Sequence, residues 1–283
     1  MRIETHGRRT SSYQQDPTRR ATGGALRALT QAGGELLITV GAILLLFVVY
    51  EVYVTDQISA GRQHDATEAL EDRWTQARMG PEQPQELEPL QGEGILRLYA
   101  PALGPDFTRT VLEGTSQDIL ATGPGHYTGT ALPGQPGNLA IAGHRVGHGA
   151  PFNRIDLLQS CDALIVETLT GWFVYRVLPM PDELAEWAQG KGAQPRCRGV
   201  APLAAPYPVV PGQETVLPSN GTVIAAVPGQ PRYAVPAPEA RAQLITLTTC
   251  TPKFSAQQRL IVHGVLVARY PSGGGPPAEL VGG

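Results

Sequence analysis

The residues best suited to carry out chemistry lie near the C-terminal end of the chain. Two β-branched, apolar runs at 244–250 and 259–270 are typical of strands, and Pro252 ends the first of them. If these strands pair as an antiparallel hairpin, Cys250 and Arg259 lie opposite each other at its open end. A neighbouring guanidinium favours the thiolate, which is the nucleophilic form of cysteine. The spacing therefore predicts a reactive thiol at a strand end.

A candidate acid–base partner for this thiol lies far upstream. The apolar segment 139–144 is typical of a strand and closes with His144. His126 and His148 lie in glycine-rich segments with no predicted strand to fix them, and His263 lies deeper along its own strand. His144 is therefore the expected proton donor and acceptor.

Strand alternation separates two faces of the 244–250 run. Cys250 shares one face with Thr246 and Thr248, whereas Ile245 and Leu247 point to the other. The polar face suits a groove, and the apolar face suits a core.

An apolar segment near the N-terminus predicts a membrane anchor. Residues 36–54 are apolar except for Glu51, and nineteen helical residues nearly cross a hydrocarbon core of about 30 Å. Arginine residues precede this segment and none follows directly, so the N-terminus is expected in the cytoplasm. A cleaved signal peptide is the alternative, but the preceding tail is long and no A-x-A pattern follows.

The rest of the chain divides by composition. Residues 1–35 form a basic, polar tail that we expect to be disordered. Residues 55–93 are expected to be a helical stalk followed by a linker rich in proline and acidic residues. A narrow apolar stripe on the helix leaves weak self-association open; its members are Ala66, Ala69, Leu70, Trp74 and Ala77. Residues 94–270 contain the core-forming sequence, and 271–283 read as a disordered tail.

Composition and motifs limit the fold and the function. Short strands at close intervals, few helices, and 33 glycines with 26 prolines favour a closed all-β barrel. The net charge of −3 gives no electrostatic reason to expect a nucleic-acid partner. The chain has no P-loop, CxxC or HExxH motif, so we expect no cofactor and no metal.

The motifs together resemble the sortase family. They are TLTTC at 246–250, Arg259 and GHR at 143–145, and the detail of Gly123–Arg145 is most similar to class E, from high-GC Gram-positive bacteria. The resemblance runs from about Gly94 to Tyr270. It implies an eight-stranded β-barrel with short helices as the catalytic domain, 94–270, behind a transmembrane anchor and stalk.

The resemblance also implies a reaction. Cys250 attacks the Thr–Gly bond of an LAxTG-type C-terminal sorting signal, His144 protonates the leaving amine, and Arg259 holds the oxyanion or the peptide. Tyr127 and Thr249 are the candidate substrate-binding residues. The partners implied are secreted proteins with sorting signals, an amine of a peptidoglycan precursor, and the bilayer; the catalytic domain is then extracellular.

Two other functions are weighed against this one. A non-catalytic, membrane-anchored barrel that binds peptide or cell-wall polymer has no need of the complete Cys/His/Arg set. A transpeptidase of the L,D type carries an SHGC-like motif, which is absent. The sequence departs from the sortase pattern at 181–212, a long connection with a short predicted helix, Asp182–Gln189.

Three cysteines in an exported chain leave two arrangements open. One is a single reactive thiol with one disulfide, and the other is three reduced cysteines. With Cys250 as the nucleophile, we expect Cys161 and Cys197 to pair and to tie the long connection to the strand before it.

Overall fold

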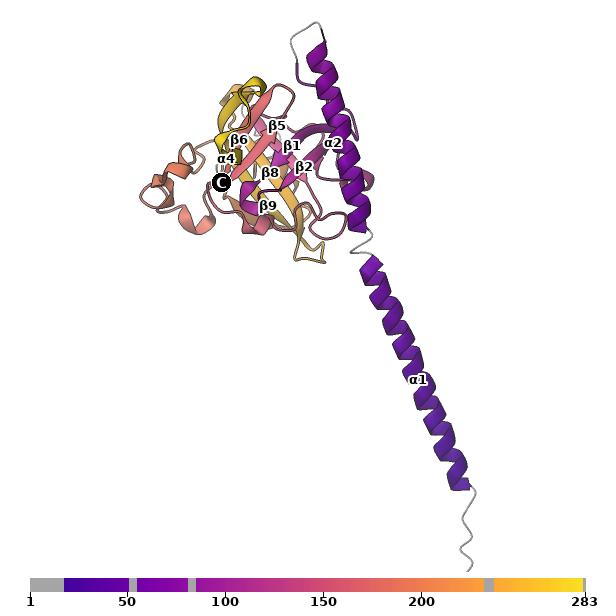
Figure 1. Ribbon diagram of the computed structural model, residues 1–283. Coiled ribbons are helices and arrows are strands. Elements are labelled where there is room, and N and C mark those ends of the chain that lie inside the picture. The colour runs from indigo at the N-terminus through magenta and orange to yellow at the C-terminus, as the bar shows by residue number, and fades with distance from the viewer. Residues whose placement is uncertain (1–17, 51–54, 81–84, 232–236, 282–283) are drawn as a thin grey trace, which may run out of the picture. The chain divides into compact units, whose positions relative to one another are not determined.

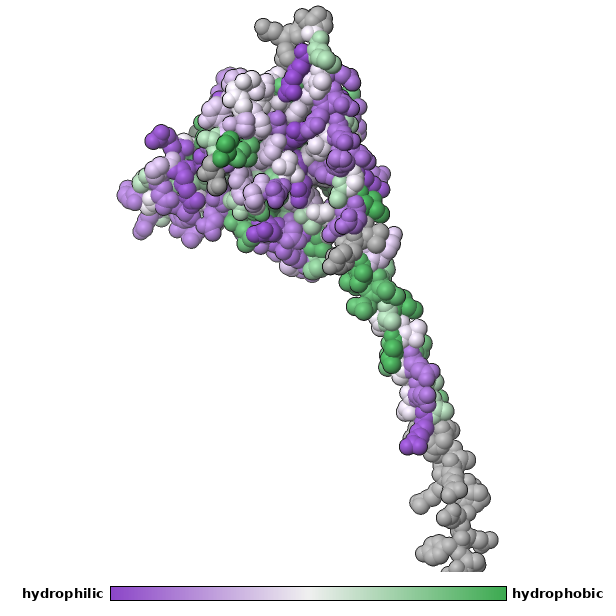
Figure 2. Space-filling model, viewed as in Figure 1, coloured by the Kyte–Doolittle hydropathy of each residue, from purple (hydrophilic) through white to green (hydrophobic). Residues whose placement is uncertain are grey.

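The computed structural model describes residues 18–50, 55–80, 85–231 and 237–281. The chain forms two compact units, Met1–Tyr50 and Glu51–Gly283. The described part of the first, 18–50, contains helix α1 (Thr18–Val49), so the later part of the tail that we expected to be disordered is helical. Within α1, Arg27–Val49 is long and apolar enough to cross a membrane, and its large apolar side chains are exposed (Figure 2). The last four residues of the predicted anchor lie outside the described residues.

The second unit is built on one sheet that closes on itself (Figure 1). Its strands are β1 (Gly94–Tyr99), β2 (Thr108–Glu113), β3 (Gly125–His126), β4 (Gly137–Ala142), β5 (Ala163–Glu167), β6 (Gly171–Val177), β7 (Gln213–Val216), β8 (Gln243–Thr251) and β9 (Gln258–Pro271). In the described part of the chain, eight strands form a ring in the order β6-β5-β1-β2-β3-β4-β8-β9, because β6 also pairs with β9. The predicted eight-stranded barrel is confirmed.

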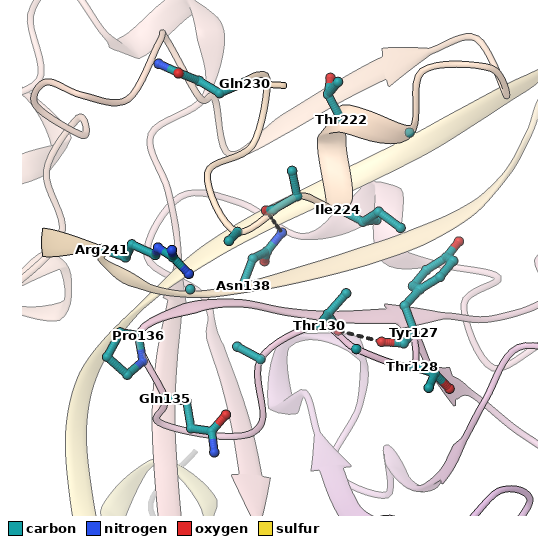
Figure 3. A pocket seen from close by; sticks show the side chains of 16 residues that line it. Tyr127, Thr128, Thr130, Gln135, Pro136, Asn138, Thr222, Ile224, Gln230 and Arg241 are labelled. Carbon is teal, nitrogen blue, oxygen red and sulfur yellow. Dashed lines mark hydrogen bonds between the residues drawn. The ribbon is translucent and has the colours of Figure 1, made fainter. Parts of the chain in front are cut away.

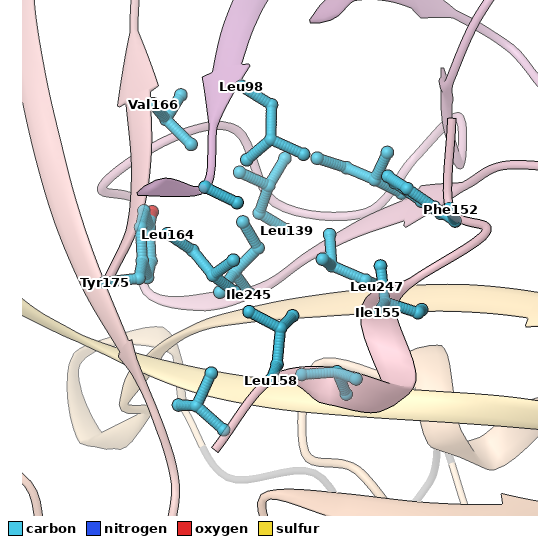
Figure 4. Packing of buried hydrophobic residues seen from close by; sticks show 14 of the residues in the cluster. Leu98, Leu139, Phe152, Ile155, Leu158, Leu164, Val166, Tyr175, Ile245 and Leu247 are labelled. Carbon is cyan, nitrogen blue, oxygen red and sulfur yellow. The ribbon is translucent and has the colours of Figure 1, made fainter. Parts of the chain in front are cut away.

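The long strand β9 closes this barrel. One edge of β9 pairs with β8, while the other pairs first with β7 over 259–262 and then with β6 over 264–271. Side chains of alternating strand positions fill the interior, including Leu98, Leu139 and Ile245 (Figure 4). Ile245 and Leu247 are at most 1% exposed, so the apolar face predicted for β8 does face the core.

Short helices lie between the strands and after the last of them. They are α3 (Gln117–Leu120), α4 (Ala278–Val281) and 3₁₀ turns at Pro101–Leu103, Ile155–Leu157, Pro181–Glu183, Lys191–Ala193, Pro195–Cys197, Gly221–Ile224, Pro238–Ala240 and Ser272–Gly274. The continuous helix predicted over 182–189 is wrong, since only the 3₁₀ turn and bends occur there. Trp187 explains the difference: it is 6% exposed and its indole N–H donates to the Val200 carbonyl at 3.0 Å, so tertiary contacts fix this backbone.

The Cys161–Cys197 disulfide holds the long connection 181–212 to the barrel, as expected. Both half-cystines are buried with Trp187 and Val200 in a small cluster of their own. The connection therefore has a covalent and an apolar attachment.

Helix α2 (Thr55–Met79) is not a free stalk, because it packs along β1 and β2 (Figure 1). Leu70 and Trp74 are 1% and 2% exposed and pack with Leu169. Trp74 also lies under the Arg97 guanidinium, 5.1 Å from its carbon to the ring centroid. The apolar stripe seen in the sequence is thus half of an intramolecular interface.

A row of polar residues one turn apart makes the other half of this interface. Gln63 accepts from the backbone N–H of Thr110 at 2.6 Å, and the Thr67 and Thr110 hydroxyls lie 2.7 Å apart. Ser59 donates to the Ala121 carbonyl at 2.8 Å. Because Thr110 precedes the part of β2 that pairs with β3, its N–H needs a partner from outside the sheet.

The C-terminal segment is also ordered, contrary to the expected disordered tail. Glu279 of α4 pairs with Arg176 at 2.8 Å, and Leu280 packs against a cluster that includes Trp172. An ion pair and an apolar contact therefore hold 271–281 on β6.

Removal of the Trp74 side chain tests whether α2 is part of the folded domain. Trp74→Ala is expected to lower the free energy of unfolding by about 3–5 kcal/mol, the usual cost of deleting a buried aromatic ring. Gln76→Ala, at an exposed position two residues further on, should change this free energy by less than about 0.5 kcal/mol. Denaturant unfolding of the full-length chain in detergent measures both. Equal, small effects would mean that α2 is a free stalk.

Thiol counting tests the disulfide. The unfolded, unreduced chain should expose one thiol, and the reduced chain three. The 36-residue separation of the half-cystines predicts a stabilisation of about 3–4 kcal/mol in the chain-entropy model. Three thiols before reduction would disprove the bond.

Candidate active site

The β8–β9 hairpin sets Cys250 and Arg259 opposite each other. Their pairing is part of a continuous antiparallel register, so the geometry predicted from the spacing is confirmed. Cys250 is a partly exposed free thiol. Arg259 is half-buried, and one guanidinium nitrogen donates to the Ala256 and Gln258 carbonyls, each at 3.1 Å. Since Arg259 also pairs with Val216 of β7, strands on both sides hold its backbone.

The parallel pairing of β4 with β8 brings His144 to the same level. Six consecutive pairs keep one offset, ending at Ala142 opposite Thr248. The Gly143 N–H continues this ladder to the Thr248 carbonyl at 3.0 Å. Two residues past the end of β4, His144 is therefore level with Cys250 on the neighbouring strand.

Side chains on both sides of Cys250 bind the residues on both sides of His144. Thr249 donates its hydroxyl to the Gly143 carbonyl at 2.8 Å, and Arg145 donates to the Thr251 hydroxyl at 2.8 Å. Arg145 also pairs with Asp156 at 3.1 Å. The histidine and the cysteine are thus held by contacts that avoid their own reactive atoms.

Thr249 has a different place from the one expected of a substrate-binding residue. It is 3% exposed, and its hydroxyl proton is used by Gly143. It acts on the position of the His144 segment, because an unpaired carbonyl in this buried position would be costly. Gly143 itself has no room for a side chain, since a Cβ there would lie 2.5 Å from the Phe152 ring.

The His144 ring is half-buried and lies beside His148, with 4.9 Å between the ring centroids. Burial, and after it the proximity of His148, lower the pKa of His144 below its ordinary value. The neutral imidazole is therefore favoured at neutral pH, and it can take a proton from a thiol.

Two other histidines are fully engaged in the barrel. His126 lies in β3, contrary to our placement of it in an unsupported loop; it is 2% exposed, and its Nδ1 lies 2.6 Å from a Glu113 carboxylate oxygen. His263 is fully buried, with its Nδ1 2.8 Å from the Thr246 hydroxyl and its Nε2 3.2 Å from Glu214. Neither ring is available to the thiol.

The polar face of β8 is open only near Cys250. Thr246 is fully buried and donates to Asn138 at 2.7 Å; Thr248 is 5% exposed. Asn138 in turn donates to the carbonyls of Val223 and Ala225 at 3.3 and 3.1 Å. The groove expected along this whole face is therefore closed at its deep end, and sequence reasoning missed Asn138. Its signal was an amide within an otherwise apolar strand.

A groove of about 890 Å³ has Tyr127 in its lining (Figure 3). One wall is the segment 127–138, which joins β3 to β4, and the other is 221–230 with Arg241. Tyr127 connects the groove to the active strand, because its hydroxyl lies 3.0 Å from that of Thr248, two residues before Cys250. Within the described residues, no group of three or more His, Cys, Asp or Glu is placed to hold a metal ion.

Comparison with known sequences agrees with this geometry. A model of the sortase domain matches residues 98–267, more than half of the chain. Sortase SrtE1 of Streptomyces coelicolor is 33% identical over 265 residues, which cover 91% of this chain and 63% of that protein, so the chain spans less than two thirds of it. Sortase SrtE2 of the same organism is 30% identical over 258 residues, with 87% and 86% covered.

Solved structures show the same fold. The SrtF sortase from Corynebacterium diphtheriae is 37% identical and superposes with a TM-score of 0.59, covering 73% of this chain and 100% of its own. Sortase E1 from Streptomyces coelicolor, crystallised with a tripeptide in the active site, is 30% identical with a TM-score of 0.50, covering 68% and 99%.

Proposed function

The chain belongs to the sortase family, and we propose that it is a membrane-anchored cysteine transpeptidase. The observation that carries the proposal is the strand register, which places three residues from three adjacent strands opposite one another. Cys250 is the next-to-last residue of β8, Arg259 lies opposite it as the second residue of β9, and His144 lies two residues past β4, the strand on the other edge of β8. A nucleophile, a proton carrier and a fixed positive charge then meet, and Tyr127 connects the strand of Cys250 to the groove.

The reaction proceeds in two steps of acyl transfer. The Cys250 sulfur attacks the threonine carbonyl of the Thr–Gly bond while its proton passes to the neutral His144 ring. The C–N bond breaks as His144 gives this proton to the departing glycine amine, which leaves a thioester. An amine of a cell-wall precursor then attacks the thioester, and its proton returns through His144 to the cysteine. The thioester conserves the acyl energy, so no nucleotide is consumed.

Arg259 stabilises the charge that develops on the carbonyl oxygen or orients the peptide backbone. Its guanidinium is held by two carbonyls of the hairpin turn, which leaves other N–H groups of the planar fork for an oxyanion. A group that is already in place costs little reorganisation when the charge appears.

Tyr127 supports a preference for LAxTG over LPxTG signals. Its phenol can donate to Thr248 and still accept from a peptide N–H, because a phenol oxygen both donates and accepts. Alanine at the second position of the signal provides such an N–H, whereas proline does not. The substrates proposed are therefore secreted proteins that end in an LAxTG-type signal.

The anchor places enzyme and substrate in one layer. We assign α1 as a single-pass span with a cytoplasmic N-terminus and an extracellular barrel. The Cys161–Cys197 disulfide supports the exported location, because such bonds persist outside the reducing cytoplasm. Confinement to the membrane surface raises the effective concentration of a substrate that is itself anchored there.

Substitution of the three residues tests the assignment. Cys250→Ala should abolish both peptide cleavage and thioester formation. His144→Ala and Arg259→Ala should each lower kcat/KM by about 10²–10⁴-fold, and Arg259→Lys should also be poor because an ammonium lacks the planar fork. Cleavage of an LAxTG peptide by the full-length chain, with and without an added amine, measures these effects. A peptide adduct on Cys250→Ala, seen by intact mass, would overturn the assignment.

Tyr127→Phe tests the specificity. One hydrogen bond is worth about 0.5–1.5 kcal/mol net, so the wild-type protein should prefer LAxTG several-fold. The variant should narrow the ratio of kcat/KM for the two peptides while keeping its turnover. A wild-type preference for LPxTG, or a ratio unchanged in the variant, would contradict this role of Tyr127.

A further inference from the structure

The geometry points to His148 as a positioning residue for His144, held in place by Asp56 of α2. The inference rests on the proposed role of His144. It concerns a chain of contacts that runs from the first turn of α2, through the loop 147–150, to the ring of His144. Nothing in the sequence pattern links these three segments.

His144 needs an orienting group that its own neighbourhood does not otherwise supply. In catalytic constellations a third group normally fixes the ring of the acid–base residue. Among the described residues, no side chain hydrogen-bonds the His144 ring, and its backbone carbonyl is taken by the Phe152 N–H at 3.0 Å. The ring contact that the structure does contain is His148, 4.9 Å away and tilted by 34°.

The loop that carries His148 has a backbone that needs outside support. Four consecutive residues have positive φ: 66° at Gly147, 51° at His148, 71° at Gly149 and 37° at Ala150. This conformation is unfavourable for the two residues that carry a Cβ. Such a run persists where other contacts determine it.

Helix α2 supplies one of those contacts. The Gly149 N–H donates to the Asp56 carboxylate at 2.8 Å. One turn further on, Ser59 is 3% exposed and donates to the Ala121 carbonyl, which fixes this end of α2 on the barrel. A Cβ built on Gly149 would lie 3.5 Å from that of Ser59, so helix and loop are in van der Waals reach.

His148 has two separable effects on His144. Its ring limits the rotation of the His144 imidazole by stacking, and its proximity disfavours the imidazolium, in the direction already given for the pKa of His144. The other charged or titratable groups on the elements around His144 include Cys250, Arg259, Arg145 with Asp156, Asp56 on Gly149, Arg154 on the Leu103 carbonyl, and Lys253 of the hairpin loop, which bonds Asn153. All of them stay unchanged when His148 is replaced.

Asp56 lies close to the end of α1 in the sequence. Thr55, where α2 starts, follows Val49, the last residue of α1, by six residues. The segment directly after the proposed anchor therefore helps to set the geometry of the proton carrier. The sequence alone would have assigned it to a spacer.

Paired substitutions in the full-length chain test these contacts. Asp56→Ala and His148→Ala should each lower kcat by about tenfold with little change in KM, because they misplace His144 without touching the groove. The double variant should be no worse than about either single one, since both act through the same ring. Asp56→Asn keeps an acceptor for Gly149 and should restore most of the rate. Asp65→Ala, an exposed carboxylate on the same helix, is the matched control.

The pH profile separates positioning from general destabilisation. His148→Phe keeps a ring but removes the like charge, so the pKa of His144 should rise in the kcat/KM profile and in an NMR titration of labelled histidine. Thermal melting shows which variants are folded. Additive losses in the double variant, or an unmoved His144 titration in His148→Phe, would overturn the inference. If His144→Ala is inactive while these variants match wild type, the inference fails alone; if His144→Ala stays active, the proposed function fails first.

Discussion

The two-sided pairing of β8 is the constraint on which the site depends. One edge of this strand is parallel to β4, and the other is antiparallel to β9. Because a ladder fixes which residues are level, these two pairings place His144, Cys250 and Arg259 together without any direct bond between their side chains. A slip of one residue in either ladder would turn the reactive side chain to the opposite face of the sheet.

Buried hydroxyl and amide groups lock that register. The Thr246 hydroxyl donates a hydrogen bond to Asn138, and the Thr249 hydroxyl donates one to the Gly143 carbonyl. The Thr251 hydroxyl accepts one from Arg145. A buried polar group without a partner costs about 1–3 kcal/mol, so each of these bonds penalises a shifted alignment. Two threonines of TLTTC, Thr246 and Thr249, and the following Thr251 therefore hold the strand of Cys250 against β4.

Segments outside the barrel are ordered where the barrel leaves groups unsatisfied. Gln63 of α2 accepts a hydrogen bond from the Thr110 N–H of β2, which has no partner in the sheet. Arg176 on β6 forms an ion pair with Glu279 of the C-terminal segment. The stalk and the tail that composition suggested are thus parts of one folded unit, 51–283.

The sequence by itself determined the elements whose signal is local. Strand alternation placed Ile245 and Leu247 in the core, and the spacing across the 250–259 turn predicted the pairing of Cys250 with Arg259. The apolar run that closes with His144 singled out this residue as the proposed proton carrier, and the cysteine count allowed the Cys161–Cys197 bond. These patterns come from periods of two residues or from short turns, which any stretch of chain reveals without its partners.

Only the tertiary structure decided the contacts that join distant segments. Asn138 and Thr246 are 108 residues apart, Tyr127 and Thr248 are 121 apart, and Asp56 and Gly149 are 93 apart. The stripe on α2 read as a stalk because amphipathicity shows that a face is covered, not what covers it. His148 lay in a glycine-rich loop with no period at all. Its loop is held by the hydrogen bond from the Gly149 N–H to the Asp56 carboxylate, on a helix that is far away in the sequence, and this bond exists only once the barrel has closed.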